Sequence, residues 1–302
     1  MKTLISFIKN RTKLNANIIL ISDFHKLYKL QGLTDEVITA FQDFIYLFYK
    51  SKKRNFPFRE NITPYKIVVS EIMLQQTQTN RVAEKFLEFI KKFPDFISLA
   101  QASVEELLSV WQGLGYNRRA LALKKIAERI INEFNGNVPK DLNALTSLPQ
   151  IGHNTASSIL SFAYNIPTYF IETNIRRVYI YFFFPGKSQI DDKEIMEIVK
   201  ISIDKDNPRD WYYALMDFGT MLKKTHPELN KKSVHYRKQS KFDGSTRQVR
   251  GKVLKLLLEK PISTKEIIDK INYEEKKVLE ILNTLKKEGF IQKEQDKYFI
   301  KN

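Results

Sequence analysis

Two glutamates stand where a carboxylate could do acid–base work. Glu71 lies among apolar residues in Pro64–Thr79, a stretch that we expect to be helical. Such a carboxylate turns to solvent, pairs with a base, or sits in a pocket that raises its pKa, as a general acid requires. Glu172 follows an apolar run and precedes Thr173 and Asn174, which can cap the next helix. We expect Glu172 to stay ionised there, although taken alone it could equally be only a partner of the helix dipole. One protonated and one ionised carboxyl can protonate a leaving group and stabilise the cation left behind.

The stretch Leu148–Ala156 predicts a tight hairpin between two helices. Gly152 permits close backbone approach or a positive φ, and the N–H groups of the fresh helix N-terminus can face an anion. By itself, such a turn is as well explained as a structural corner between helices. The residues that we expect at this anion site are Leu148, Gln150, Gly152, His153, Asn154 and Thr155.

The charge balance favours a polyanionic partner. The chain of 302 residues has 50 Lys and Arg against 34 Asp and Glu, a net charge of +16. Nucleic acid is the simplest partner, and a lysine-rich solubilising surface is the alternative. Glutamine amides, as in the run Gln75–Gln78, can hydrogen-bond base edges or wedge into an opened base stack.

The composition also excludes several kinds of site. With no cysteine, the chain can form no disulfide, thiolate nucleophile, zinc–thiolate site or cysteine-ligated iron–sulfur cluster. The four histidines are scattered, so we expect no cofactor and no metal, except that the hairpin could hold a structural cation. Because no apolar run approaches about 18 residues and no secretory signal is recognisable, we expect a soluble cytoplasmic protein associated with the nucleoid.

Periodicity predicts a mainly α fold in which the elements fall into four parts. The last part combines three helices with a β-hairpin, the pattern of a winged helix-turn-helix. Its third helix has mixed charge, so docking to protein is as plausible as reading DNA. The expected parts are an N-terminal extension over 1–30, a helical domain over 31–225, a basic linker over 226–245, and the winged helix over 246–302.

Four segments occur in an order that is similar to a known family: Ser70–Gln78, Gly113–Tyr116, Leu148–Gly152 and Asn174–Val178. Together they resemble the helix-hairpin-helix DNA glycosylases of the endonuclease III superfamily, and most of all the A/G-specific adenine glycosylase branch. The resemblance runs from about Phe44 to Leu222. It implies a two-lobed, all-α fold that extrudes a base from duplex DNA and cleaves its N-glycosidic bond in base-excision repair.

The resemblance assigns roles by matching position. Glu71 resembles the acid that protonates the departing base, and Glu172 falls where the family usually has an aspartate that stabilises the oxocarbenium-like sugar. Gln75 and Gln76 match the segment that fills the base stack, and Tyr116 matches the residue beside the opened pair. Residues 148–153 match the hairpin that binds DNA phosphate.

Four departures from the family pattern bear on function. Glu172 is one methylene longer than aspartate, which shifts the carboxylate by roughly 1 Å and can slow catalysis. Asn154 stands where bifunctional members carry a Schiff-base lysine, so we expect no AP-lyase activity. Lys223 and Lys224 stand where relatives commonly carry four cluster-binding cysteines. The predicted winged helix replaces the C-terminal domain with which full-length adenine glycosylases read oxidised guanine.

We therefore expect a monomeric, monofunctional glycosylase that acts on double-stranded DNA with adenine opposite guanine or 8-oxoguanine. An alternative keeps the scaffold but releases mismatched thymine or uracil, or another damaged base. A further alternative is a non-catalytic DNA-binding or regulatory protein, in which Glu172 marks lost activity.

Overall fold

The computed structural model describes residues 21–238 and 241–301. The chain divides into two compact units: the first unit holds residues up to 54 and 165–237, and the second holds residues 55–164 and 238–302. The expected domain over 31–225 is thus shared between the two units. Within the described residues, no helix is both long and apolar enough to cross a membrane.

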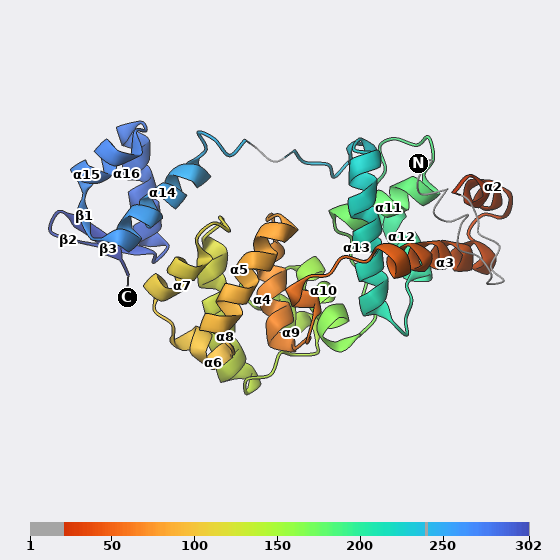
Figure 1. Cartoon of the computed structure of the whole chain (residues 1–302), viewed down its shortest axis with the longest axis horizontal. Coiled ribbons are helices and arrows are strands. Elements are labelled where there is room, and N and C mark those ends of the chain that lie inside the picture. The colour runs from red at the N-terminus through yellow and green to blue at the C-terminus, as the bar shows by residue number, and fades with distance from the viewer. Residues whose placement is uncertain (1–20, 239–240, 302) are drawn as a thin grey trace. The chain divides into compact units, whose positions relative to one another are not determined.

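The first unit is helical and has an aromatic core. Its elements are α2 (Ile21–Gln31), α3 (Asp35–Lys52), α11 (Thr173–Phe183), α12 (Asp192–Ser202), α13 (Pro208–Thr225) and the 3-10 turn η2 (Leu229–Lys232). Helix α13 packs beside α3 and α11 (Figure 1). Phe41 makes edge-to-face contacts with Phe182, Phe183 and Trp211 at ring-centroid distances of 4.9–5.4 Å. Such aromatic pairs stabilise a core beyond the apolar area that they bury.

Helix α2 lies in the stretch for which the sequence predicted no element, and residues 1–20 of that stretch lie outside the described residues. Phe24, the buried residue of α2, is fully enclosed and meets Phe182 edge to face at 5.1 Å. This helix therefore packs as part of the first unit.

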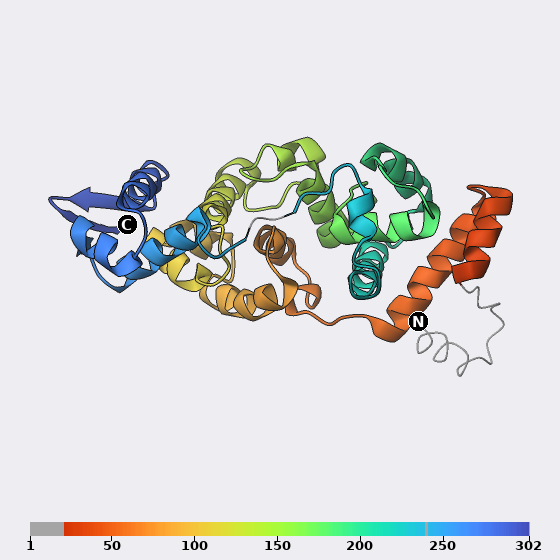
Figure 2. The ribbon, with the colours of Figure 1, turned by 90° about the horizontal axis from the view of Figure 1, so that it is seen from above.

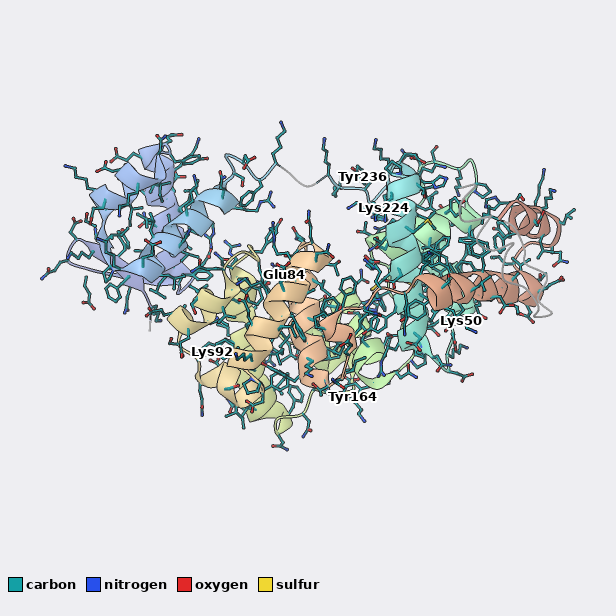
Figure 3. All side chains as sticks on the ribbon, viewed as in Figure 1. Lys50, Glu84, Lys92, Tyr164, Lys224 and Tyr236 are labelled. Atoms are coloured by element: carbon teal, nitrogen blue, oxygen red, sulfur yellow. The ribbon has the colours of Figure 1, made fainter. Side chains whose placement is uncertain are left out.

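The second unit begins with eight short elements around a buried aliphatic and aromatic core. They are η1 (Pro57–Arg59), α4 (Pro64–Leu74), α5 (Thr79–Lys92), α6 (Phe96–Gln101), α7 (Val104–Trp111), α8 (Arg118–Phe134), α9 (Leu142–Thr146) and α10 (His153–Tyr164). Helix α4 packs on α10, and α6 packs on α8. Figure 3 labels Glu84 and Lys92 on α5, and Tyr164 at the end of α10, whose hydroxyl donates to the carbonyl of Val138 at 2.6 Å.

Local sequence explains most of the helix boundaries. Ser103 and Glu106 form a reciprocal capping box, which fixes the start of α7. Pro94 lies between α5 and α6, and Asp95 caps α6, so the two helices are separate. The helix predicted over Pro64–Thr79 ends at Leu74.

The C-terminal module, which we define as residues 244–301, has the order of elements expected for a winged helix. It contains α14 (Thr246–Glu259), β1 (Ile262–Ser263), α15 (Thr264–Ile271), α16 (Glu275–Lys287), β2 (Ile291–Glu294) and β3 (Lys297–Ile300). Its sheet is antiparallel in the order β1-β3-β2, and β2 and β3 are the two arrows at the blue end of the chain in Figure 2. The strand β1 was not predicted, because two residues carry no readable period.

Part of the expected linker over 226–245 packs instead of connecting. Leu229 and Asn230 are buried in η2, and Asn230 Nδ2 donates to the carbonyl of Thr173 at 3.1 Å. Ser233 forms a parallel bridge with Ile190. The chain therefore leaves the first unit only after this turn.

Candidate functional site

Glu71 meets a buried serine on the facing helix. Ser158 Oγ on α10 is 3% exposed as a residue, and its hydroxyl hydrogen-bonds Glu71 Oε2. The same Oγ lies 3.0 Å from the carbonyl oxygen of Thr155. A hydroxyl has one proton to donate. When Ser158 donates to the Thr155 carbonyl, its contact with Glu71 is a hydrogen bond only if Glu71 carries a proton. The geometry accommodates both forms of Glu71: the carboxylate accepts from Ser158, and the protonated acid donates to it.

The glutamine that follows α4 is tied to the predicted hairpin. Gln75 Nε2 donates to the carbonyl of Gln150 at 3.3 Å and lies 3.4 Å from Thr155 Oγ1. Gln76 is exposed and has a φ of 56°, in the left-handed region. We call Gln75–Gln78 the glutamine turn. Glu71, the glutamine turn and the hairpin are therefore held together within the second unit.

One buried guanidinium organises this turn and the next. Arg119 is 3% exposed, and its Nη1 donates to the carbonyls of Ile72, Met73 and Gln75 at 2.6–2.9 Å. Its Nη2 donates to Thr77 Oγ1, Leu114 O and Gly115 O at 2.9–3.2 Å. Arg119 thus satisfies the carbonyls of Ile72 and Met73 in the last turn of α4, which stabilises the end of the helix at Leu74. Burial lowers the pKa of Arg119 to about 10, so it stays charged at neutral pH.

Tyr116 closes the turn between α7 and α8. It has a φ of 47°, and its ring centroid lies 5.4 Å from the guanidinium carbon of Arg119. Thr77 Oγ1 also lies 3.2 Å from the carbonyl of Leu114, which links this turn to the glutamine turn. Two segments that are about 40 residues apart in the sequence thus form one surface.

The hairpin exposes most of the residues that we expect at the anion site. Gln150, Gly152, His153 and Asn154 are exposed, and Thr155 is half-buried. The left-handed residue is Gln150, with a φ of 58°, and Gly152 has no positive φ. A Cβ on Gly152 would meet nothing within 4 Å, which leaves room for a ligand's backbone.

Leu148 has a different role from its expected neighbours at the anion site. The whole residue is only 2% exposed, so Leu148 anchors the hairpin in the core, and a direct contact with DNA does not fit its burial.

Glu172 is itself the cap of α11, in place of the predicted Thr173 or Asn174. Its Oε1 accepts the backbone N–H groups of Asn174 at 2.8 Å and Ile175 at 3.0 Å. Burial of the carboxyl raises the pKa of Glu172, although these N–H donors and Arg177 oppose that shift. The expected ionised state of Glu172 thus depends on a balance of opposed effects and stays a prediction.

A close helix contact fixes the position of this cap. A Cβ on Gly219 in α13 would lie 2.4 Å from the carbonyl oxygen of Asn174, so only glycine fits there. Arg177 Nη1 joins the two helices by donating to Asn174 Oδ1 at 2.9 Å and to Gly219 O at 2.8 Å. Glu172 belongs to the first unit, whereas Glu71 belongs to the second.

Sequence reasoning missed Ser158 and Arg119. Ser158 stood in an apolar helix with neighbouring serines, and its register relative to Glu71 depends on how α4 packs on α10. Arg119 stands beside Arg118 at the start of α8, and this local pattern does not distinguish a buried arginine from an exposed one. The turn Gly113–Tyr116 follows the end of α7, and its carbonyls need hydrogen-bond donors from outside the helix. That need was the signal that a nearby arginine could be buried against this turn.

The residues after α13 do not fit an iron–sulfur cluster, because the chain has no cysteine to ligate one. The segment at that place contributes the packed turn η2 instead. Over residues 21–238 and 241–301, no group of three His, Asp or Glu side chains is placed to hold a metal ion.

The central part of the chain is similar to known DNA repair proteins. Residues 69–203 match the HhH-GPD superfamily of base excision DNA repair proteins. The chain is 32% identical over 198 residues to the adenine DNA glycosylase of Buchnera aphidicola subsp. Baizongia pistaciae, covering 64% of this chain and 56% of that protein. It is 38% identical over 131 residues to the adenine DNA glycosylase of Mycobacterium tuberculosis, covering 43% of each. The match thus spans about half the length of these relatives.

Solved structures support the same fold. A thermostable thymine-DNA glycosylase matches with a TM-score of 0.55 at 24% identity, over 66% of this chain and 96% of that one. A trapped endonuclease III–DNA covalent intermediate matches with a TM-score of 0.53 at 21% identity, over 63% and 87%. Together with the family match, they confirm the predicted mainly α, endonuclease III-like architecture.

Proposed function

We propose that this chain is a monofunctional DNA glycosylase, because residues 69–203 match the HhH-GPD superfamily of base excision DNA repair proteins. We propose adenine opposite guanine or 8-oxoguanine as its target, because adenine DNA glycosylases are 30–38% identical over the shared region. It acts as a monomer on duplex DNA in the cytoplasm, at the nucleoid.

The contact between Glu71 and Ser158 carries this proposal. Glu71 hydrogen-bonds a buried serine, and the turn that follows its helix is bonded to the hairpin, which supports a role for Glu71 as the acid beside bound DNA. A non-catalytic DNA-binding protein would have no need for a carboxyl at this position between apolar helices.

The proposed mechanism assigns one task to each group. Hairpin N–H groups at the start of α10 bind a backbone phosphate, and Gln75, Gln76 and Tyr116 fill the space left by the extruded nucleotide. Glu71 donates its proton to the base, and the N-glycosidic bond breaks with its electrons leaving on the base. Ionised Glu172 stabilises the oxocarbenium-like sugar until water adds to it.

A panel of duplexes tests the proposal directly. Each duplex carries adenine, thymine or uracil opposite guanine, or adenine opposite 8-oxoguanine, and released base is measured by chromatography. We expect adenine from its two duplexes. Release of thymine or uracil alone would reassign the substrate, and duplex binding without any base release would favour a regulatory protein.

Asn154 predicts the state of the product strand. An amide side chain forms no imine with the sugar aldehyde, so the abasic strand should remain intact until hot alkali is added. Denaturing gels with and without alkali measure this. The same duplex treated with a bifunctional endonuclease III serves as the positive control, and a borohydride-trapped covalent complex of this protein would contradict the prediction.

The raised pKa of Glu172 predicts an acid limb in the rate. As the pH falls through the raised pKa, Glu172 becomes protonated and the ionised form is lost. Single-turnover cleavage should therefore decline with a midpoint above 4.5, the ordinary pKa of a glutamate. Glu172→Gln should be slow and should lack this limb, because the amide does not titrate. A wild-type rate that stays flat down to pH 4.5 would contradict an ionised role for Glu172.

A further inference from the structure

The C-terminal module contacts the turn at Tyr116. Arg247, in the first turn of α14, donates from Nη1 to the Tyr116 hydroxyl, and its guanidinium carbon lies 5.3 Å from the ring centroid. Arg119 lies at 5.4 Å from the same ring. Two cationic groups therefore hold one aromatic ring, and one of them comes from the module.

A second contact holds the module to the same part of the second unit. Glu288, which follows α16, accepts hydrogen bonds from Arg118 at the start of α8 and from Arg250 of α14, the latter at 2.5 Å. The pair of Arg250 and Glu288 lies within the module, with side chains 16% and 19% exposed, and it holds the Glu288 carboxylate in place. Arg118, whose side chain is 63% exposed, reaches this carboxylate from α8 and so joins the module to the rest of the second unit.

Four arginines lie along this junction. Arg118 and Arg250 bind the Glu288 carboxylate, whereas Arg119 and Arg247 contact the Tyr116 ring. Arg119 is buried, and Arg118 is exposed. Arginine clusters of this kind bind phosphate.

The junction also adjoins the expected DNA-filling groups. Arg119 donates to the carbonyls of Gln75 and Gly115, and Arg247 donates to the hydroxyl of Tyr116. Hydrogen bonds therefore connect the glutamine turn, the turn that carries Tyr116, and the C-terminal module. A phosphate bound near Tyr116 would belong to the DNA at the distorted base pair.

We propose that the C-terminal module extends the DNA-binding surface of the second unit, with Arg247 as a positioning residue that holds Tyr116 and with Arg118 and Arg247 as contacts for the DNA backbone. This inference rests on the proposed glycosylase function. It gives the module a task within base recognition, as opposed to recruitment of a protein.

Binding measurements on the full chain test the proposal without requiring catalysis. The variants are Arg247→Ala, Arg247→Lys, Tyr116→Phe and the double variant Arg247→Ala with Tyr116→Phe. Lys252→Ala is the matched control, because Lys252 is an exposed cation on the same helix. The probes are a duplex containing a tetrahydrofuran abasic-site analogue and the same duplex without it.

We expect Arg247→Ala to weaken binding to the abasic duplex by about tenfold, which corresponds to about 1.4 kcal/mol. Its effect on the intact duplex should match that of Lys252→Ala, about twofold, because only general charge is lost there. Arg247→Lys should recover part of the binding, and Tyr116→Phe should add little in the Arg247→Ala background because the two groups act together.

Equal losses for Arg247→Ala and Lys252→Ala on both duplexes would overturn the proposal. A fall in melting temperature for Arg247→Ala with unchanged abasic-site affinity would also overturn it, since the contact would then be structural. If no base is released from the duplex panel but the abasic-site preference depends on Arg247, the proposed function fails while this inference stands.

Discussion

Replacing Glu71 with glutamine should lower the single-turnover rate of base release by about 10²- to 10⁴-fold, the usual contribution of a general acid. The amide keeps the size of the side chain and can still hydrogen-bond Ser158, but it cannot donate a proton to the departing base. Affinity for the abasic duplex should stay within about twofold, because the glutamine turn and the hairpin are unchanged. Quench-flow with enzyme in excess over the adenine mispair measures the rate.

Two further variants separate chemistry from packing. Glu84→Gln removes an exposed carboxylate from α5 of the same unit and should retain the wild-type rate. Ser158→Ala removes the hydroxyl beside Glu71 and should cost about tenfold, because the carboxyl is then less well oriented. Wild-type rates for Glu71→Gln would remove Glu71 from the mechanism.

Replacing Arg119 with methionine should lower the free energy of unfolding by about 3 kcal/mol. The substitution keeps much of the apolar stem but removes the donors of seven hydrogen bonds, and six of their acceptors are backbone carbonyls. Urea denaturation followed by circular dichroism measures the change. Lys125→Met, which removes an exposed cation from the same helix, should change stability by less than about 0.5 kcal/mol.

The Arg119 variant should also lose the preference for distorted DNA at temperatures where it remains folded. Gln75 and Tyr116 are both held through this guanidinium, so removing it releases the two turns together. A variant that is destabilised but still discriminates the abasic duplex would show that the turns keep their conformation without it.

Sequence reasoning worked best where the evidence is local. Caps and breakers such as Ser103 and Pro64 act within one turn, so a short run of sequence is enough to locate the start of a helix near them. Glu71 could be found because a lone carboxylate in an apolar helix contradicts the pattern around it. The family likeness reinforced this, because its motifs are also local runs.

The remaining features depend on contacts that no local pattern encodes. Arg119 reaches carbonyls 44 to 47 residues earlier, and those contacts determine where α4 ends. Glu172 replaced Thr173 as the helix cap because its longer side chain can fold back onto two N–H groups. The meeting of Arg247 with Tyr116 spans 131 residues and depends on how the C-terminal module docks.

The left-handed backbone at Gln76, Tyr116 and Gln150 has a consequence for how a ligand is met. A side chain in that region costs roughly 1 kcal/mol per residue relative to glycine, which adopts it freely. Each of the three positions nevertheless carries a long or aromatic side chain on a turn that we expect to face DNA. Folding has therefore already ordered these turns, and DNA meets a preorganised surface whose conformational entropy was lost before binding began.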